Sequence, residues 1–242
     1  MTGALYIEDQ PRERGRCPLL IAHACNSERA VARALDAGAD AIEADVWLES
    51  GRLTLRHERK LPHLPLLVDK WYVRRAKGLI ELPDLAREVD GRAGLFLDLK
   101  SQGDAMLRAV ARAIERLGRP FVQVSSRHWN LLDALLHALP GLSTWYSVGS
   151  RRELAALFER VETGRSRAEG VSVRHGLLDA RVAARLREAG LKIYAWIVPD
   201  PERGERIASL GAHGVIADNV HLWTTDAFAQ LSPLPVTVRT RP

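Results

Sequence analysis

Residues 41–46 read Ala-Ile-Glu-Ala-Asp-Val, an apolar run typical of a buried strand that carries two carboxylates, Glu43 and Asp45. Side chains two positions apart point to the same face of a strand, so both acids are expected to point the same way. Neighbouring carboxylates in an apolar setting are costly unless a cation neutralises them. The run therefore indicates half of a site for a hard metal ion. Solvated acids at a strand end, or acids paired with nearby Arg, are the alternative.

Around this run, strand-like and helix-like segments alternate through the chain. Predicted strands cover 18–22, 41–48, 95–100, 121–125, 142–148, 170–173, 192–198 and 214–217. Predicted helices cover 27–37, a short segment from 82, 104–117, 129–138, 151–162, 179–189, 201–209 and 221–231. Eight such units predict an α/β fold, a single-domain (β/α)8 TIM barrel with parallel strands. A doubly wound open sheet is the runner-up, but the first strand lacks the Gly-rich loop that usually follows it there.

The predicted barrel spans 18–232, between a polar N-terminal arm (1–17) and a C-terminal tail (233–242). The segment at about 58–80 lacks periodicity and is predicted to be a loop insertion on the surface, over the site.

Composition narrows the class of protein. The chain is 46% hydrophobic and 27% charged, which is ordinary for a globular domain. Its net charge of +5 comes from Arg spread along the chain, so no nucleic-acid partner is expected. Two cysteines, Cys17 and Cys25, are too few for a disulfide scaffold or a thiolate zinc cluster, which favours a reduced setting. With no apolar stretch of a signal peptide or membrane span, we expect a cytoplasmic protein.

Polar and aromatic residues stand at the carboxyl ends of several predicted strands, where functional residues of such barrels gather. They are His23, Glu43, Asp45, His57, Asp98, Lys100 and Trp196. Singly, each has a structural explanation: a satisfied His, an Asp–Lys ion pair, a packed Trp. Together at one rim they indicate a functional site, because inward-facing charge on two strands is poor design for a core.

These residue types suit phosphodiester cleavage. Three carboxylates suit one divalent cation, Mg²⁺ or Ca²⁺. The metal and a lysine would neutralise charge on the phosphoryl oxygens, and two histidines could act as acid and base.

The sequence resembles the glycerophosphodiester phosphodiesterases. The likeness rests on Ile-Ala-His at 21–23, Gly-Ala-Asp-Ala-Ile-Glu-Ala-Asp-Val at 38–46, Leu-Asp-Leu-Lys at 97–100, Ala-Trp-Ile-Val at 195–198 and the block 211–218. It implies a TIM barrel that hydrolyses glycerophosphodiesters to sn-glycerol 3-phosphate and an alcohol. A neighbouring substrate hydroxyl would attack first and give a cyclic phosphate.

The resemblance also implies roles for single residues. The catalytic acid–base pair would be His23 and His57. The divalent cation would be held by Glu43, Asp45 and Asp98. Lys100 would contact the phosphate, and Trp196 would line the pocket.

Departures from the family pattern point toward a related branch, the sphingomyelinase D enzymes. The usual His-Arg-Gly is His-Ala-Cys here, followed by Asn26, and an Asp-Leu-Lys strand is present. This branch acts on choline phospholipids and releases a cyclic phosphate, so Asn26 is a candidate substrate-binding residue. Arg127, just after the fourth strand, could replace the missing phosphate-binding Arg. A catalytically silent barrel that binds phospholipid or phosphate is a further alternative, although it would have little reason to keep both histidines.

Segment 52–77 combines basic and aromatic residues. Its basic residues are Arg52, Arg56, Arg59, Lys60, Lys70, Arg74, Arg75 and Lys77. With Trp71 and Tyr72 among them, the segment could contact an anionic membrane surface. A solvated loop whose Trp packs on the barrel rim is the alternative.

Overall fold

The computed structural model describes residues 18–61, 64, 66–69, 71–75, 78–117 and 122–223, and in these residues eight parallel strands close into a barrel. The strands are β1 (Leu19–Ala22), β2 (Ala41–Glu49), β7 (Gly94–Leu99), β8 (Val122–Ser126), β9 (Ser143–Val148), β10 (Gly170–Arg174), β11 (Lys192–Trp196) and β12 (Gly214–Ala217). Each pairs with its neighbours in chain order, and β12 pairs with β1 to complete the ring. The predicted TIM barrel is confirmed.

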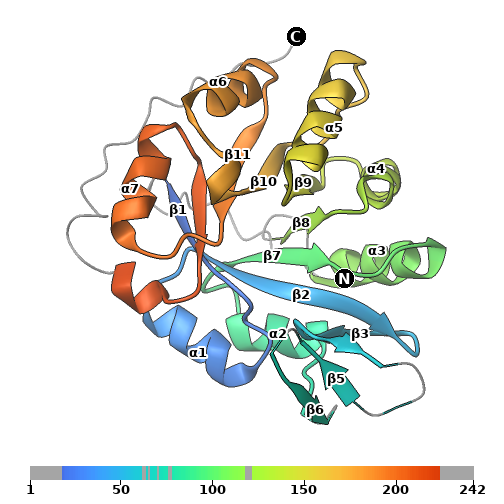
Figure 1. The fold of residues 1–242 in the computed structure, drawn as a ribbon. Coiled ribbons are helices and arrows are strands. Elements are labelled where there is room, and N and C mark those ends of the chain that lie inside the picture. Colours follow the sequence, from blue (N-terminus) through green and yellow to red (C-terminus); the bar gives the residue numbers. More distant parts are fainter. Residues whose placement is uncertain are drawn as a thin grey trace, which may run out of the picture.

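Helices surround the strands (Figure 1). They are α1 (Glu28–Asp36), α2 (Leu82–Val89), α3 (Asp104–Leu117), α4 (Trp129–Ala138), α5 (Arg151–Glu162), α6 (Ala180–Glu188) and α7 (Pro201–Ser209). Short 3-10 turns, η2 (His175–Leu177) and η3 (Val220–Trp223), follow β10 and β12. The expected closing helix (221–231) overlaps η3 at 221–223, and the rest of it lies outside the described residues. Cys17, the N-terminal arm and the C-terminal tail also lie outside them. None of the helices in the described segments is long and apolar enough to cross a membrane.

Local sequence signals define where the helices begin. Ser27, Ser150, Asp179 and Asp200 each accept a hydrogen bond from a backbone N–H in the first turn of the following helix. Such caps satisfy donors that have no partner within the helix. After α1, Gly38 adopts a φ of +75°, a conformation that a side chain would strain. These short connections bring the chain back to the sheet for the next parallel strand.

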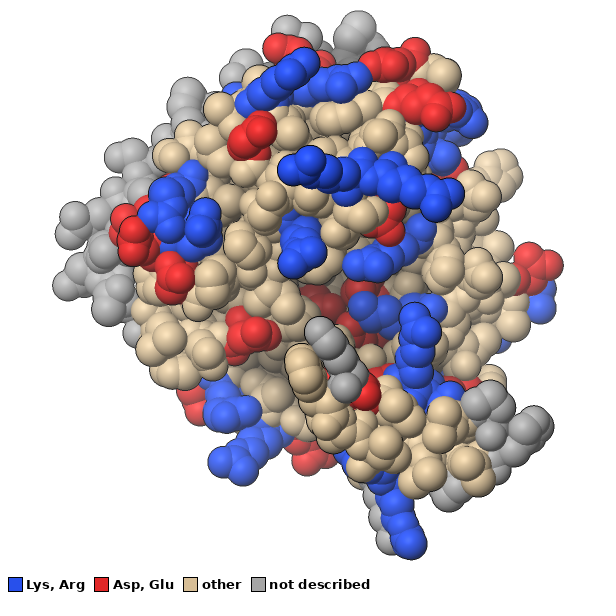
Figure 2. Space-filling view, viewed as in Figure 1, with Lys and Arg blue, Asp and Glu red and all other residues tan. Residues whose placement is uncertain are grey.

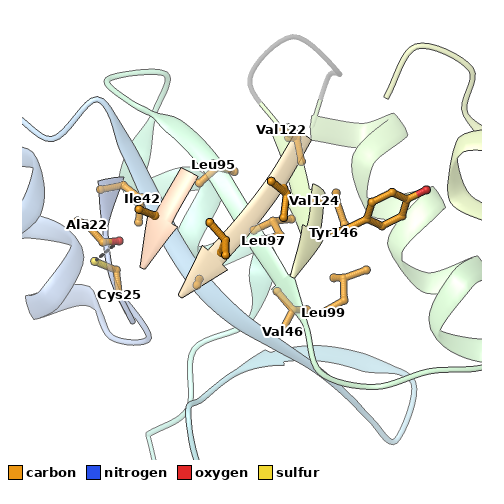
Figure 3. Packing of buried hydrophobic residues seen from close by; sticks show 14 of the residues in the cluster. Ala22, Cys25, Ile42, Val46, Leu95, Leu97, Leu99, Val122, Val124 and Tyr146 are labelled. Atoms are coloured by element: carbon orange, nitrogen blue, oxygen red, sulfur yellow. Dashed lines mark hydrogen bonds between the residues drawn. The ribbon is translucent and has the colours of Figure 1, made fainter. Parts of the chain in front are cut away.

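The period-two pattern of β2 separates two cores. Ile42 and Val46 point outward and pack with Leu97 of β7 in the layer between strands and helices (Figure 3). A second, smaller cluster fills the inside of the barrel, where the rings of Trp145 and Tyr194 stack with centroids 3.7 Å apart. Because the interior is packed below, inward side chains nearer the carboxyl ends of the strands face an open mouth.

The segment after β2 departs from the expected irregular loop. β3 (Arg52–Leu55) pairs antiparallel with β2, and β4 (Arg59–Lys60), β5 (Leu66–Val68) and β6 (Val73–Arg75) form a separate antiparallel sheet. Strands of two or three residues carry too few positions to show a period in the sequence. Leu67 of this small sheet is fully buried, and Val68 lines a cavity together with barrel residues.

The basic residues of this region are not all on the surface. Arg56 is buried, stacks 4.3 Å from the centroid of the Trp47 ring and pairs with Glu49 at 2.5 Å. Its expected place among surface cations is therefore wrong, because an internal carboxylate and a ring neutralise and cover it. Lys70 and Lys77 lie outside the described residues.

Candidate active site

A cavity of about 170 Å³ opens at the carboxyl ends of the barrel strands. In the space-filling view, acidic atoms lie in a hollow at the middle of this face, with basic side chains around it (Figure 2). The cavity is lined by His23, Glu43, Asp45, His57, Phe96, Asp98, Lys100, Ser125, Arg127, Ser147, Ser172, Trp196, Ile197 and Ile216. Of the nine site residues predicted from the sequence, this set contains every one except Asn26.

Three acids from two neighbouring strands form the centre of the cavity. Glu43 and Asp45 point inward from β2, and the sheet register pairs Asp45 with Asp98 of β7. Each of the three offers a carboxylate oxygen, and these oxygens all lie within 4.8 Å of one another. Hard divalent cations prefer such an oxygen set, so the residues fit the expected Mg²⁺ or Ca²⁺.

The charge of Glu43 is poorly compensated. Burial, and then the nearby Asp45 carboxylate, raise the pKa of Glu43 to about 8. Its Oε2 accepts a hydrogen bond of 2.6 Å from the backbone N–H of Ala24, but within the described residues it makes no ion pair. An added cation would relieve this repulsion, which is a second reason that the cluster fits a metal ion.

Lys100 neutralises the other two acids. Its Nζ lies 2.8 Å from Asp45 Oδ1 and also contacts Asp98 Oδ2. Burial alone would lower the pKa of Lys100, but Asp98 and Asp45 raise it, so the ammonium stays charged. The ion pair considered in the sequence is therefore present, and it places a cation on the edge of the acidic cluster.

Two polar side chains fix the carboxylates in position. The Nδ2 of Asn26 donates to Asp45 Oδ2 at 2.7 Å, and its Oδ1 accepts from the backbone N–H of Asp45 at 2.9 Å. Ser125 donates to Asp98 Oδ1 at 2.9 Å. Both amide atoms of Asn26 bond to Asp45, and its side chain does not line the cavity. Its expected role in substrate binding stays a prediction.

The two histidines both line the cavity and lie close to each other. Their ring centroids are 6.5 Å apart, with planes inclined at 75°. The Nδ1 of His23 lies 2.6 Å from Asp218 Oδ1, so its Nε2 is the nitrogen available to a ligand. His57 is half-exposed, with Nδ1 3.4 Å from Asp69 Oδ2.

Asp218 is a functional candidate that sequence reasoning missed. The register that pairs Ala22 of β1 with Ala217 of β12 places His23 beside Asp218, although 195 residues separate them. Burial alone would lower the pKa of His23, but the Asp218 hydrogen bond and Glu43 raise it to about 9. The sequence signal that could have identified Asp218 is its position directly after the last predicted strand, at the end of the block 211–218.

Arg127 and Trp196 form the opposite wall. The Arg127 guanidinium lies 5.8 Å from the centroid of the Trp196 ring, and the indole N–H donates to the Ser172 carbonyl at 2.9 Å. A Cβ at Gly149 would meet Arg127 at 2.5 Å, so the absence of a side chain there makes room for the guanidinium. Arg127 therefore lines the cavity, and its expected contact with a phosphate stays a prediction.

No known family model matches this chain, and no curated protein matches it by sequence. Solved structures do match. A glycerophosphodiester phosphodiesterase from Thermotoga maritima is 22% identical, with a TM-score of 0.67 over 85% of this chain and 96% of that one. A glycerophosphodiester phosphodiesterase from Parabacteroides distasonis is 18% identical, with a TM-score of 0.70 over 88% of this chain and 97% of that one.

A phosphodiesterase from Oleispira antarctica, solved with the product sn-glycerol-3-phosphate, is 17% identical, with a TM-score of 0.71 over 87% of this chain and 96% of that one. The likeness therefore covers nearly the full length of each structure. This chain has the (β/α)8 barrel fold of these phosphodiesterases.

Proposed function

We propose that this protein is a metal-dependent phosphodiesterase that hydrolyses glycerophosphodiesters to sn-glycerol 3-phosphate and an alcohol. One observation carries the proposal: a single cavity holds three clustered carboxylates, two of them buried, with a lysine and two histidines, one of which is bonded to Asp218. The shared fold, and the product in the Oleispira antarctica structure, support the same chemistry.

The cavity supplies charge stabilisation for a phosphodiester. A bound Mg²⁺ or Ca²⁺ would be held by Glu43, Asp45 and Asp98 and would neutralise negative charge on the phosphoryl oxygens. Lys100 and Arg127 contribute further positive charge from two sides of the cavity.

His23 and His57 supply the proton transfers. One imidazole takes the proton of the attacking hydroxyl as the new P–O bond forms, and the other gives a proton to the alcohol oxygen as its P–O bond breaks. With a neighbouring substrate hydroxyl as nucleophile, the product is a cyclic phosphate, which water opens by the reverse transfers. Asp218 keeps the His23 ring oriented throughout.

Phosphorus NMR of product formation tests the proposal. With glycerophosphocholine and Mg²⁺ or Ca²⁺, we expect the resonance of sn-glycerol 3-phosphate to appear, and a chelator to abolish it. His57→Asn should remove the activity, whereas His137→Asn, an exposed histidine on α4, should not. Metal-independent turnover, or full activity of His57→Asn, would contradict the proposed chemistry.

A second substrate class is favoured by a larger cavity beside the first, which we call the side groove. Its volume is about 650 Å³. It is lined by Trp47, His57, Arg59, Leu61, Val68, Asp69, Asp98, Leu99, Lys100, Arg127 and His128. Since His57, Asp98, Lys100 and Arg127 line both cavities, the chain of a lysophospholipid could lie in the side groove with its phosphate in the catalytic cavity. A cyclic phosphate released from lysophosphatidylcholine in the same NMR assay would support this alternative.

A further inference from the structure

Exposed apolar side chains are concentrated in one short part of the molecule. Among the described residues, six large hydrophobic side chains are exposed, and five of them lie between positions 61 and 73. They are Leu61, Leu64, Trp71, Tyr72 and Val73, with exposed fractions from 36% to 80%. Single exposed apolar residues are normal, but a cluster of this kind marks an interaction surface.

These side chains lie in and beside the small sheet, with Val73 in β6 and the other four in the adjoining turns. Opposite residues in antiparallel strands share a face. The register aligns Arg59, Val68 and Val73 on one face, and Lys60, Leu67 and Arg74 on the other. Leu67 is fully buried and Val68 is partly buried in the side groove, whereas Val73 and the basic side chains of both faces are exposed. We call the exposed side chains that the structure describes in this region the insertion face; they are Arg59, Lys60, Leu61, Leu64, Trp71, Tyr72, Val73, Arg74 and Arg75.

The insertion face is held by contacts next to the catalytic cavity. Glu58 is buried beside His57 in the sequence, and its Oε1 accepts from Tyr72 Oη at 3.0 Å and from Arg74 Nε at 2.5 Å. These bonds fix the hairpin that carries Trp71, so little further order has to be gained on binding.

The charge of the insertion face is positive. The described residues of 59–75 include four basic side chains, Arg59, Lys60, Arg74 and Arg75, and one acid, Asp69. Within the described parts of the chain, Arg59 and Arg75 are exposed and make no ion pair. Cations around exposed Trp and Tyr complement anionic lipid headgroups, since the rings favour the membrane interface.

The insertion face is also continuous with the proposed site. Arg59 and Leu61 belong to it and line the side groove, beside the partly buried Val68. The side groove extends to Asp98 and Lys100 in the catalytic cavity. In the space-filling view, mainly uncharged atoms cover β5 and β6, beside the acidic hollow (Figure 2). We propose that the insertion face docks this protein on an anionic phospholipid surface, with the mouth of the barrel next to the membrane.

Vesicle binding of the full chain, measured without turnover, tests the proposal independently of the proposed activity. Co-sedimentation would be compared for vesicles of phosphatidylcholine alone and of phosphatidylcholine mixed with phosphatidylserine. We expect binding to the mixed vesicles only, with a loss of about tenfold or more in Trp71→Ala combined with Arg75→Glu. The matched control combines Leu222→Ala with Arg152→Glu, an exposed apolar residue and an exposed arginine elsewhere, and should bind like the unmodified protein.

Turnover of soluble glycerophosphocholine by the same variants separates the two proposals. Both double variants should keep the rate of the unmodified protein, because neither change touches the catalytic cavity. Failure of the unmodified protein to bind mixed vesicles, or equal binding by the Trp71 and Arg75 variant, would overturn the docking proposal. A dimer that Trp71→Ala converts to a monomer would assign the face to a protein interface instead, which also overturns it.

Discussion

Glu43→Gln should stabilise the metal-free protein while removing its response to metal. The pKa of Glu43 is raised from its ordinary value of 4.5 to about 8 by burial and by Asp45. Near pH 7, keeping this side chain folded therefore costs up to about 3 kcal/mol, at about 1.4 kcal/mol per pH unit above 4.5. Glutamine keeps the shape and can still accept the bond from the Ala24 N–H, but it carries no charge.

We expect the free energy of unfolding to rise by about 1–3 kcal/mol, because the cost of burying the amide offsets part of what removing the charge gains. For a chain of this size, that corresponds to a rise of roughly 2–10 °C in Tm with a chelator present. The sign follows from linkage: a carboxyl group with a raised pKa destabilises the folded state above pH 4.5. The advantage of Glu43→Gln should therefore shrink as pH falls toward about 4.5.

Thermal unfolding followed by circular dichroism, with chelator and then with Mg²⁺ or Ca²⁺, measures both effects. The unmodified protein should gain stability on metal addition, and Glu43→Gln should not. Glu58→Gln is the matched control, because Glu58 is also a buried glutamate. Burial alone would raise the pKa of Glu58, but its contacts with Arg74 and Tyr72 outweigh that effect and lower the pKa. That variant should be destabilised and keep its metal response. A lower Tm for metal-free Glu43→Gln, or an unchanged response to metal, would refute the reasoning.

Three further predictions concern Asp218 and Asn26, which contact residues of the cavity lining, and His213, which lies away from the cavity. Asp218→Asn should lower kcat about 10–100-fold with little change in KM, because His23 loses the partner that orients it. Asn26→Ala should weaken Mg²⁺ or Ca²⁺ binding by about 10–100-fold in calorimetry, because Asp45 loses two hydrogen bonds. Burial, and then nearby cations, lower the pKa of His213. Its Nδ1 accepts a hydrogen bond from a backbone N–H, so protonation of the ring opposes folding. Urea unfolding should therefore show stability falling as pH drops below about 6.5, and less so in His213→Asn.

Each of these predictions has a contrary outcome. An Asp218→Asn variant that also loses its metal-induced stabilisation would indicate damage to the acidic cluster and not to histidine orientation. Unchanged metal affinity in Asn26→Ala would return that residue to its expected place in substrate binding. Equal acid sensitivity of His213→Asn and the unmodified protein would assign the loss of stability to other groups.

The barrel and most of the cavity could be predicted because their signals are local. Eight apolar strands separated by capped helices are visible along the chain, and the spacing of Glu43 and Asp45 specifies a shared face. The same spacing brings Asp98 of the next strand and Lys100, directly after that strand, together. Their catalytic and binding roles stay predictions.

The remainder depends on three-dimensional relations that local patterns do not contain. The Asp218 contact follows from which strands close the ring and in what register. The contact of Asn26 with Asp45 could not be predicted because the two residues lie in different segments of the chain. Arg56 looked exposed because the sequence does not show that Trp47 and Glu49 cover it.

The pairing of the first strand with the last makes function depend on the whole chain. A nascent polypeptide carries its acidic trio by position 98, but the carboxylate that orients His23 is made 120 residues later. Until β12 inserts between β11 and β1, the histidine has neither its partner nor a fixed backbone. If the proposed activity holds, turnover would report ring closure, because a truncated or partly assembled barrel could bind a cation and still remain inert.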